Sequence, residues 1–460
     1  MIARRYQLRK DAVAIADRGH PWLFRDQMST AAQVFGDGDW VKLVDGTNRV
    51  VGYGIFEAEG AIAIRILRLG IAPPDAAWVR AQLAAALARR TALATRTDAL
   101  RLVNGESDGL AAVVIDRFGD TLVASSYSAG SDALARYAAQ VLAAVARGRL
   151  ELAAPAPAAP GEDNAAITQP IEIIREAIGS GWHTVPDEFD VGSTIPIAVT
   201  RPGLSRARTE PPVEHVADPA AAIGHATNVI LRPARRRQGP PQPQRVLCGS
   251  APATIAIHED GRALAVDLEG GHKTGTYLDL RALRRALAEA PLAGARVLNL
   301  FAYTGMLGSA VERAGAASIT QVDQSARALQ FASAHHVADP AKHQLLVADV
   351  FEWFPALADS EQYDLVIVDP PSMTSKAAQI PNALAAYRKL YRAAARHVLP
   401  NGVIVAACCT SRIDRDLFKR TVREALGPGF TLERDLPPEP DHPVGFAQAD
   451  YLKIGFWRRH

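Results

Sequence analysis

The chain is poor in cysteine and lacks any long apolar run. Its 460 residues include three cysteines, Cys248, Cys408 and Cys409. Three thiols cannot form a disulfide framework and lack the paired spacing of a zinc site, so we expect a reducing, cytoplasmic location and no bound metal. No stretch of about twenty apolar residues occurs, and the N-terminal stretch MIARRYQLRKDA contains no apolar signal-peptide core. The sequence therefore predicts neither membrane insertion nor export.

An excess of charge of one sign is also missing. Lysine and arginine number 51 against 49 aspartates and glutamates, which gives a formal net charge of +2. A nucleic-acid partner would therefore have to bind to a local basic surface rather than to the molecule as a whole. Such short basic runs also occur on solvated surfaces without any partner. The candidates are Arg4-Arg5, Arg9-Lys10, Arg284-Arg285 and residues 235–237.

The order of patterns along the chain predicts three domains. Residues 1–72 alternate short β-like runs, at 40–44 and 61–69, with turns rich in glycine and aspartate, which is typical of a small β-rich module. Residues 73–250 combine α and β patterns with a Pro/Ala stretch at 153–161 that indicates a linker or disordered insertion. Residues 201–244 show no sustained period, so we expect a loop there. Residues 251–460 alternate strand and helix patterns regularly.

This last part predicts an α/β fold of Rossmann-like type. Right-handed crossovers between strands and helices produce a parallel sheet with helices on both faces. In such sheets, ligands lie beyond the carboxyl ends of the strands. Four predicted strands end in a residue with a functional side chain, namely Asp323, Asp349, Asp369 and Cys409. We therefore expect these side chains to lie together at one edge of the sheet.

The first two of the regular strands indicate an adenosyl cofactor. A hydrophobic strand that runs into a glycine turn, followed by a strand that ends in a carboxylate, is one way in which such sheets bind an adenosyl group. Residues 297–305 (VLNLFAYTG) and Asp323 fit this pattern. We predict that Asp323 binds the ribose, that Asp349 receives the adenine amino group, and that Gly305 lets the backbone approach the methionine part. The remaining pocket residues would be Phe301 and Tyr303. Strand-end aspartates also serve as turn formers or helix caps, and aromatic residues beside a glycine turn also serve as simple packing.

An Asp-Pro-Pro sequence and a strand-end thiol narrow the chemistry to methylation of a nucleic-acid base by S-adenosylmethionine. C5 of cytosine is a poor nucleophile, but addition of a thiol at C6 converts the ring into an enamine whose C5 takes a methyl group. We predict that Cys409 is the nucleophile, because Cys408 should point to the opposite face of the sheet. Asp369 would hold N3 and the exocyclic amine, with Pro370 fixing its angle. A thiol at a strand end can also be an inert packing residue.

Several stretches of the chain recur, in the same order, in a known family. They are residues 18–24 (RGHPWLF), 103–119 (VNGESDGLAAVVIDRFG), 271–285 (GHKTGTYLDLRALRR), 301–305 (FAYTG), 369–371 (DPP), Cys409, 441–443 (DHP) and 451–453 (YLK). By these motifs the chain resembles the bacterial large-subunit ribosomal RNA methyltransferases of RlmI type. The resemblance implies a PUA domain, a small central α/β domain and a Rossmann-like methyltransferase domain that uses S-adenosyl-L-methionine. The chain departs from that family at Leu280, where a polar residue is usual, and across residues 153–244.

The resemblance also implies roles for residues away from the strand ends. Residues 271–285 are similar to a segment that covers the cofactor in the family. We accordingly predict that Arg281 contacts the cofactor and Lys273 the substrate, that His442 shapes the substrate side, and that Asp369 faces both ligands.

These observations together predict a cytoplasmic enzyme that forms 5-methylcytosine in large-subunit ribosomal RNA, with its first two domains binding the RNA. One alternative is methylation of guanine N2, which also uses an Asp-Pro-Pro turn. Such sites usually follow the turn with an aromatic residue that stacks on the flipped base, whereas Ser372-Met373 follow here. A second alternative is a non-catalytic RNA-binding or ribosome-assembly protein. Homodimer formation is a further option, and no membrane partner is expected.

Overall fold

The computed structural model describes residues 4–29, 34–152, 219–234, 243–374 and 377–460. The chain forms two compact units, Met1–Ala251 and Pro252–His460. The predicted linker at 153–161, the basic run at 235–237 and most of the predicted loop at 201–244 lie outside the described residues. Within the described part of that predicted loop, the structure contains a strand, β9 (Asn228–Arg232). The loop prediction was wrong there because the strand has only three buried apolar residues, too few to show a period.

The first unit begins with a five-stranded sheet in the order β1-β3-β4-β5-β2. Its strands are β1 (Arg4–Gln7), β2 (Trp22–Phe24), β3 (Trp40–Val44), β4 (Val50–Phe56) and β5 (Ile62–Leu69), and helix α1 (Lys10–Asp17) follows β1. The β-rich module predicted from the sequence is thereby confirmed. Its core includes Tyr6, Leu23, Leu43 and Phe56, all buried.

A second sheet follows in the order β10-β9-β8-β7-β6. Its strands are β6 (Ala99–Asn104), β7 (Val113–Phe118), β8 (Thr121–Ser126), β9 and β10 (Arg245–Cys248), with helices α2 (Ala76–Ala88), α3 (Thr91–Ala94) and α4 (Asp132–Ala146) beside them. Two arginines are buried in this part, and each forms hydrogen bonds with an aspartate: Arg90 with Asp108 and Arg101 with Asp116. Trp22 of β2 donates its indole N–H to Glu106 at 2.8 Å, which connects the two sheets.

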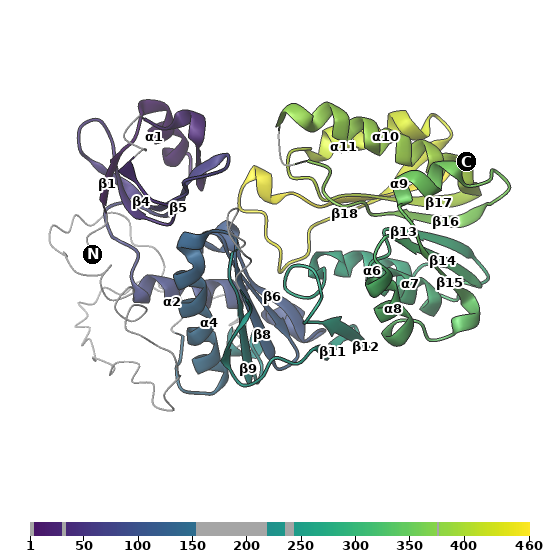
Figure 1. Cartoon of the computed structure of the whole chain (residues 1–460), viewed down its shortest axis with the longest axis horizontal. Helices are drawn as coiled ribbons and strands as arrows, with labels where there is room; N and C mark the ends of the chain where they lie inside the picture. Colours follow the sequence, from purple (N-terminus) through teal and green to yellow (C-terminus); the bar gives the residue numbers. More distant parts are fainter. Residues whose placement is uncertain (1–3, 30–33, 153–218, 235–242, 375–376) are drawn as a thin grey trace, which may run out of the picture. The chain divides into compact units, whose positions relative to one another are not determined.

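The second unit contains the predicted Rossmann-like sheet, with strand order β15-β14-β13-β16-β17-β19-β18 (Figure 1). Its strands are β13 (Arg296–Leu300), β14 (Ser318–Asp323), β15 (His343–Val347), β16 (Tyr363–Val368), β17 (Val398–Cys408), β18 (Phe430–Leu436) and β19 (Lys453–Arg459). The strands from β13 to β17 are parallel, while β19 is antiparallel to both β17 and β18. The strand order reverses between β13 and β16, so a ligand is expected at their carboxyl ends.

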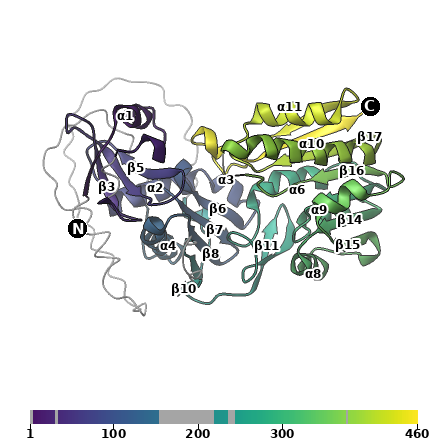
Figure 2. The ribbon, with the colours of Figure 1, turned by 45° about the horizontal axis from the view of Figure 1, so that its top comes forward.

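Helices cover both faces of this sheet because neighbouring strand residues alternate in direction. On β13, Val297 packs in a core with α6 (Arg281–Ala288) and α7 (Met306–Arg313), while Leu298 packs in another with α10 (Ile380–His397) and α11 (Arg415–Leu426). Helices α10 and α11 lie side by side in both views (Figures 1 and 2). Helix α8 (Ala326–His335) follows β14, the short helix α9 (Val350–Trp353) follows β15, and a hairpin of β11 (Thr254–Glu259) and β12 (Arg262–Asp267) precedes the sheet. Among the described residues, none of the helices has the length and apolar composition to cross a membrane.

A buried ion cluster joins the hairpin, α6 and the loop before β19. Arg281 donates to Glu439 at 2.9 Å and to both carboxylate oxygens of Asp441 at 3.1 Å, and it is 1% exposed. Arg284 donates twice to Glu259 of β11, each time at 2.6 Å. Burial raises the pKa of Asp441, but His442 and Arg281 outweigh this and lower it overall. Within the candidate basic run Arg284-Arg285, Arg284 is not available to a nucleic acid, because it is buried and bound to a carboxylate.

We expect Arg281→Met to lower the free energy of unfolding by about 3–5 kcal/mol, because it leaves buried carboxylates without their cation. The control is Arg388→Ala, which removes an exposed ion pair with Glu424 and should cost under about 1 kcal/mol. Urea unfolding of the full chain gives both values. Equal, small losses for the two variants would contradict a structural role for the cluster.

Candidate active site

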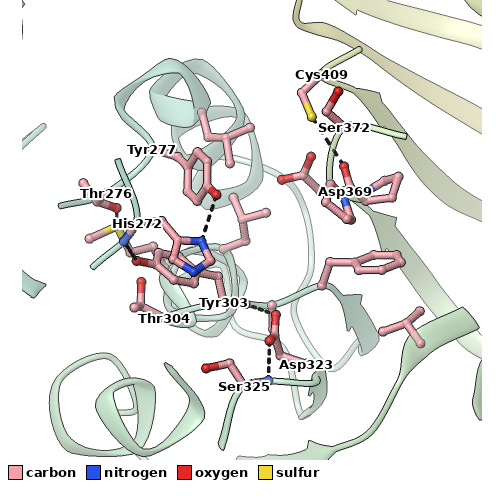
Figure 3. Close-up of a pocket in the computed structure, with 18 of the residues that line it drawn as sticks. His272, Thr276, Tyr277, Tyr303, Thr304, Asp323, Ser325, Asp369, Ser372 and Cys409 are labelled. Carbon is pink, nitrogen blue, oxygen red and sulfur yellow. Dashed lines mark hydrogen bonds between the residues drawn. The ribbon is translucent and has the colours of Figure 1, made fainter. Parts of the chain in front are cut away.

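A cavity of about 550 Å³ lies at the carboxyl ends of β13, β14, β16 and β17 (Figure 3). This volume is in the range of small-molecule and cofactor sites. Most of the residues predicted from the sequence line it: Lys273, Phe301, Tyr303, Asp323, Asp349, Asp369, Pro370 and Cys409. Three predicted residues, Gly305, Arg281 and His442, are not among the lining residues.

The carboxylate of Asp323 is fixed at the end of β14 by two backbone amides. One oxygen accepts from the N–H of Tyr303 at 2.8 Å and the other from the N–H of Ser325 at 2.8 Å (Figure 3). A carboxylate oxygen has a second lone pair. The side chain is therefore held in one orientation at the cavity and can still accept hydrogen bonds from a ligand.

Aromatic rings form a second wall of the cavity. Tyr303 stacks on His272 with ring centres 4.9 Å apart and meets Tyr277 edge-on at 5.4 Å. Phe301 packs against Phe351 at 5.3 Å. The backbones of Phe301 and Tyr303 have positive φ angles of 60° and 48°, which in non-glycine residues costs on the order of 1–3 kcal/mol and is concentrated at functional sites. Lys273, with φ of 53°, is a third such residue in the lining.

Asp349 was predicted to end its strand, but it lies two residues beyond the end of β15. Strand β15 ends at Val347, and Asp349 caps helix α9 by accepting from the N–H of Phe351 at 2.8 Å. Asp349 also lines the cavity. The two roles that the sequence left as alternatives are thus compatible in one residue.

The three predicted residues outside the lining have structural reasons for their identity. Gly305 has a φ of 77°, and a Cβ there would come within 2.7 Å of the Cβ of Ala332, so the close packing of α7 against α8 explains the glycine. The guanidinium of Arg281 is occupied by Glu439 and Asp441. His442 is buried, with Nδ1 at 2.8 Å from Asp441. The structure places these three residues outside the cavity lining, and packing and ion pairing account for their identities.

Asp369 and Cys409 directly follow the neighbouring strands β16 and β17 and line the cavity. The part of the cavity that they line is called here its reactive end, after the roles predicted for them. The thiol of Cys409 donates to the carbonyl of Pro370 at 3.6 Å (Figure 3). Burial, and then the negative charge of Asp279, raise the pKa of Asp369 to about 7, against the opposing effect of Lys273. Burial and Asp369 raise the pKa of the Cys409 thiol to about 12. Cys408 is fully buried in the core with α10 and α11, on the opposite face of the sheet, as alternation predicted.

Sequence reasoning did not assign three lining residues at this end: Tyr277, Asp279 and Tyr451. The hydroxyl of Tyr451 donates to Asp279 at 2.6 Å. The ammonium of Lys273 lies 4.0 Å from the same carboxylate and 4.7 Å from the ring centre of Tyr277. The motifs at 271–285 and 451–453 contain these residues, but no local pattern indicates that the two motifs meet.

A buried histidine supports the turn that follows β13. Nδ1 of His336 lies 2.5 Å from the carbonyl oxygen of Thr304, and Nε2 accepts from the N–H of Ala265 in β12 at 3.1 Å. Only the neutral ring can accept at Nε2 while donating at Nδ1. Burial lowers the pKa of His336 to about 4.

Comparison with known proteins agrees with this geometry. Residues 208–453 match a family model described as S-adenosylmethionine-dependent methyltransferase, and residues 7–69 match a PUA-like domain. A ribosomal RNA large subunit methyltransferase of Deinococcus radiodurans is 30% identical over 453 residues, which cover 95% of this chain and 93% of that protein. The ribosomal RNA large subunit methyltransferase I of Shewanella amazonensis is 28% identical, with coverage of 95% and 94%.

Solved structures show the same fold along the chain. A protein of Streptococcus mutans, assigned as a SAM-dependent methyltransferase, superimposes with a TM-score of 0.70 at 20% identity and covers 99% of this chain and 100% of its own. A second structure with the same scores, of an assigned methyltransferase, is complexed with SAH. These matches confirm the family resemblance predicted from the motifs and the combination of a PUA-like domain with a Rossmann-like domain.

The lowered pKa of His336 predicts a pH dependence of stability. Because the folded state holds the ring neutral to about pH 4, while an unfolded histidine protonates near pH 6.5, the contribution of His336 is complete above about pH 6.5 and is lost as the pH falls towards 4. His336→Gln should therefore destabilise more at pH 7 than at pH 5, with the two penalties differing by roughly 1–2 kcal/mol. Unfolding free energies at the two pH values provide the measurement. His335→Gln, at the exposed neighbour, is the control, and equal penalties at both pH values for His336→Gln would contradict the assignment.

Proposed function

We propose that this chain, which belongs to the family of S-adenosylmethionine-dependent methyltransferases, methylates C5 of a cytosine in large-subunit ribosomal RNA through a covalent bond between Cys409 and C6. The RNA class is supported by the names of relatives that align over nearly the whole chain. The PUA-like domain at residues 7–69 and the central domain would bind the RNA. The observation that supports the cytosine product most directly is the thiol of Cys409 beside the carboxyl of Asp369 in one cavity.

The part of the cavity that is lined by Asp323, Asp349 and Phe301 fits S-adenosylmethionine. Asp323 presents a carboxylate already oriented by two backbone amides, which suits the ribose hydroxyls. Asp349 would receive the adenine amino group, and the rings of Phe301 and Phe351 supply an apolar wall. When bound, the cofactor supplies an electrophilic methyl group.

The thiol of Cys409 must lose its proton before it can react, and a nearby positive charge favours the thiolate. With a pKa of about 12, the thiol of Cys409 is protonated at neutral pH. Lys273 lines the same cavity and lowers that pKa. We propose that the thiolate forms as the substrate base enters and that the thiol proton passes to the departing water. The Lys273 charge then acts more strongly on the sulfur, because water has left the site.

Asp369 is suited to protonate the base at N3. Its pKa of about 7 means that a large fraction of the molecules carry the proton at neutral pH. As the bond from Sγ to C6 forms, N3 takes that proton from Asp369, and the electron pair of the C5=C6 bond becomes available at C5. Neutralising the ring in this way stabilises the adduct.

We expect Asp323→Ala to weaken S-adenosylmethionine binding at least tenfold, because a hydrogen bond from a hydroxyl to a carboxylate is worth roughly 1.5–3 kcal/mol. Calorimetric titration of the full chain measures the affinity. Asp359→Ala removes an exposed carboxylate, whose side chain is 80% exposed, and should leave the affinity unchanged. Equal affinities for the Asp323 variant and the wild type would overturn the cofactor assignment.

The cytosine product is tested with a transcript of large-subunit ribosomal RNA that carries 5-fluorocytidine. After methyl transfer, fluorine at C5 cannot leave as a proton, so elimination is blocked and the wild type should remain covalently bound to the RNA on a denaturing gel. Cys409→Ala should abolish both this band and turnover. Cys408→Ala should keep both, with a stability loss of about 1–2 kcal/mol from a small packing defect.

This experiment and the calorimetric titration together separate the alternatives. A wild type that methylates ordinary RNA but forms no band with the fluorinated RNA would rule out the thiol mechanism and favour methylation of guanine N2. A chain that binds RNA but has no measurable affinity for S-adenosylmethionine would indicate a non-catalytic RNA-binding role.

A further inference from the structure

A second carboxylate faces the reactive end of the cavity. Asp279 lies in a single turn, Leu278–Leu280, just before α6, and is 9% exposed. It lines the same cavity as Asp369 and Cys409, and its charge affects the pKa of both. Methylation at C5 leaves a proton on that carbon which must be removed before the enzyme can be released. Two groups are already committed at that stage: the sulfur of Cys409 is bonded to C6, and the carboxylate of Asp369 must take back the proton that it gave to N3.

Two neighbours of the Asp279 carboxyl are a hydrogen-bond donor and a cation. The Tyr451 hydroxyl donates to it at 2.6 Å, and the Lys273 ammonium lies at 4.0 Å. A donated hydrogen bond and a nearby cation both favour a carboxylate over a carboxylic acid. When two carboxyl groups in one cavity have different surroundings, one tends to serve as the acid and the other as the base. Here Asp369, raised to a pKa of about 7, suits the acid, and Asp279, with the Tyr451 hydrogen bond and the Lys273 cation beside it, suits the base.

Tyr277, which also lines the cavity, is a poor candidate for the base. Burial, followed by the charges of Tyr303 and Asp369, raises the pKa of Tyr277 above its ordinary value. Its phenol therefore stays protonated at neutral pH.

A buried lysine holds the Asp279–Tyr451 pair in place beside the nucleophile. Lys453 is 1% exposed, and its ammonium donates to the carbonyl of Thr410 at 2.9 Å and to that of Tyr451 at 2.8 Å. Thr410 directly follows Cys409. The backbone that carries the thiol is thus tied to the backbone that carries the tyrosine, which keeps Asp279 and the sulfur at the same end of the cavity.

We propose that Asp279 is the general base that removes the C5 proton, an inference that rests on the proposed cytosine C5 methylation. The C5–H bond breaks and its proton passes to the Asp279 carboxylate. The electron pair forms the C5=C6 double bond, the C6–Sγ bond breaks, and its pair leaves on the sulfur of Cys409. N3 returns its proton to Asp369, so the base leaves as neutral 5-methylcytosine.

The test is Asp279→Asn, which keeps the shape and an acceptor for the Tyr451 hydroxyl but is not basic. This variant should add to the base and accept one methyl group per enzyme, yet fail to eliminate. It should therefore accumulate a covalent adduct on an ordinary transcript of large-subunit ribosomal RNA, on which the wild type shows none, while turnover falls about 10²–10⁴-fold. With RNA tritiated at cytosine C5, methyl incorporation should proceed without matching tritium release.

Three further variants test whether the band is a cysteine adduct and which step each residue serves. Asp279→Asn combined with Cys409→Ala should show no adduct, because the band is a cysteine adduct. Asp369→Asn should show no adduct even with 5-fluorocytidine RNA, because it blocks the addition step rather than the elimination step. Tyr451→Phe, which removes only the hydrogen bond, should release tritium more slowly than the wild type and show a weaker band. Urea unfolding of each variant checks that it retains the fold.

The outcomes separate this inference from the proposed function. If the wild type forms the adduct with fluorinated RNA, but Asp279→Asn either turns over normally or loses activity without any adduct on ordinary RNA, Asp279 is not the base. If the wild type forms no adduct with the fluorinated RNA, the cytosine mechanism itself is wrong.

Discussion

The geometry of the candidate site depends on a buried ion cluster centred on Arg281. Arg281 binds Glu439 and Asp441 within the interior of the second unit. Buried charges destabilise a protein unless each is paired and hydrogen-bonded, so the helix that carries the arginine and the loop that carries the carboxylates are coupled in folding. That loop continues to Tyr451 and Lys453, which lie at the reactive end of the cavity or hold it together. Pairing that is structural in origin thereby helps to place Tyr451 in the cavity lining.

The surroundings of the cavity favour the protonated form of the Cys409 thiol. Burial and the acidic neighbours raise the pKa of Cys409 to about 12 and that of Asp369 to about 7. A protonated thiol reacts slowly with oxidants and alkylating agents. Lys273 opposes both shifts and lies at the centre of this group, over the ring of Tyr277 and close to Asp279.

The strand-end rule explains how much of the site could be predicted from the sequence. Because parallel strands carry their carboxyl ends to one edge, the residues that end successive strands meet whatever the rest of the fold does. Asp323, Asp369 and Cys409 obeyed this rule and line one cavity. The alternation of side chains along a strand likewise distinguished Cys409 from the buried Cys408. These predictions needed only local periods and chain direction, which the sequence contains.

The sequence by itself determined the PUA-like module, the Rossmann-like sheet and the carboxylates and thiol at its strand ends, since these follow from patterns a few residues long. Only the tertiary structure decided which polar residues of the remaining motifs reach the cavity. Arg281 and Asp279 lie two residues apart in one motif. Arg281 is bound to Asp441 in the interior, whereas Asp279 lines the cavity and accepts a hydrogen bond from Tyr451, 172 positions away. A local pattern specifies the type and direction of a side chain. It does not specify its partner, because partners so distant in the chain are set by how the helices, hairpin and loop pack.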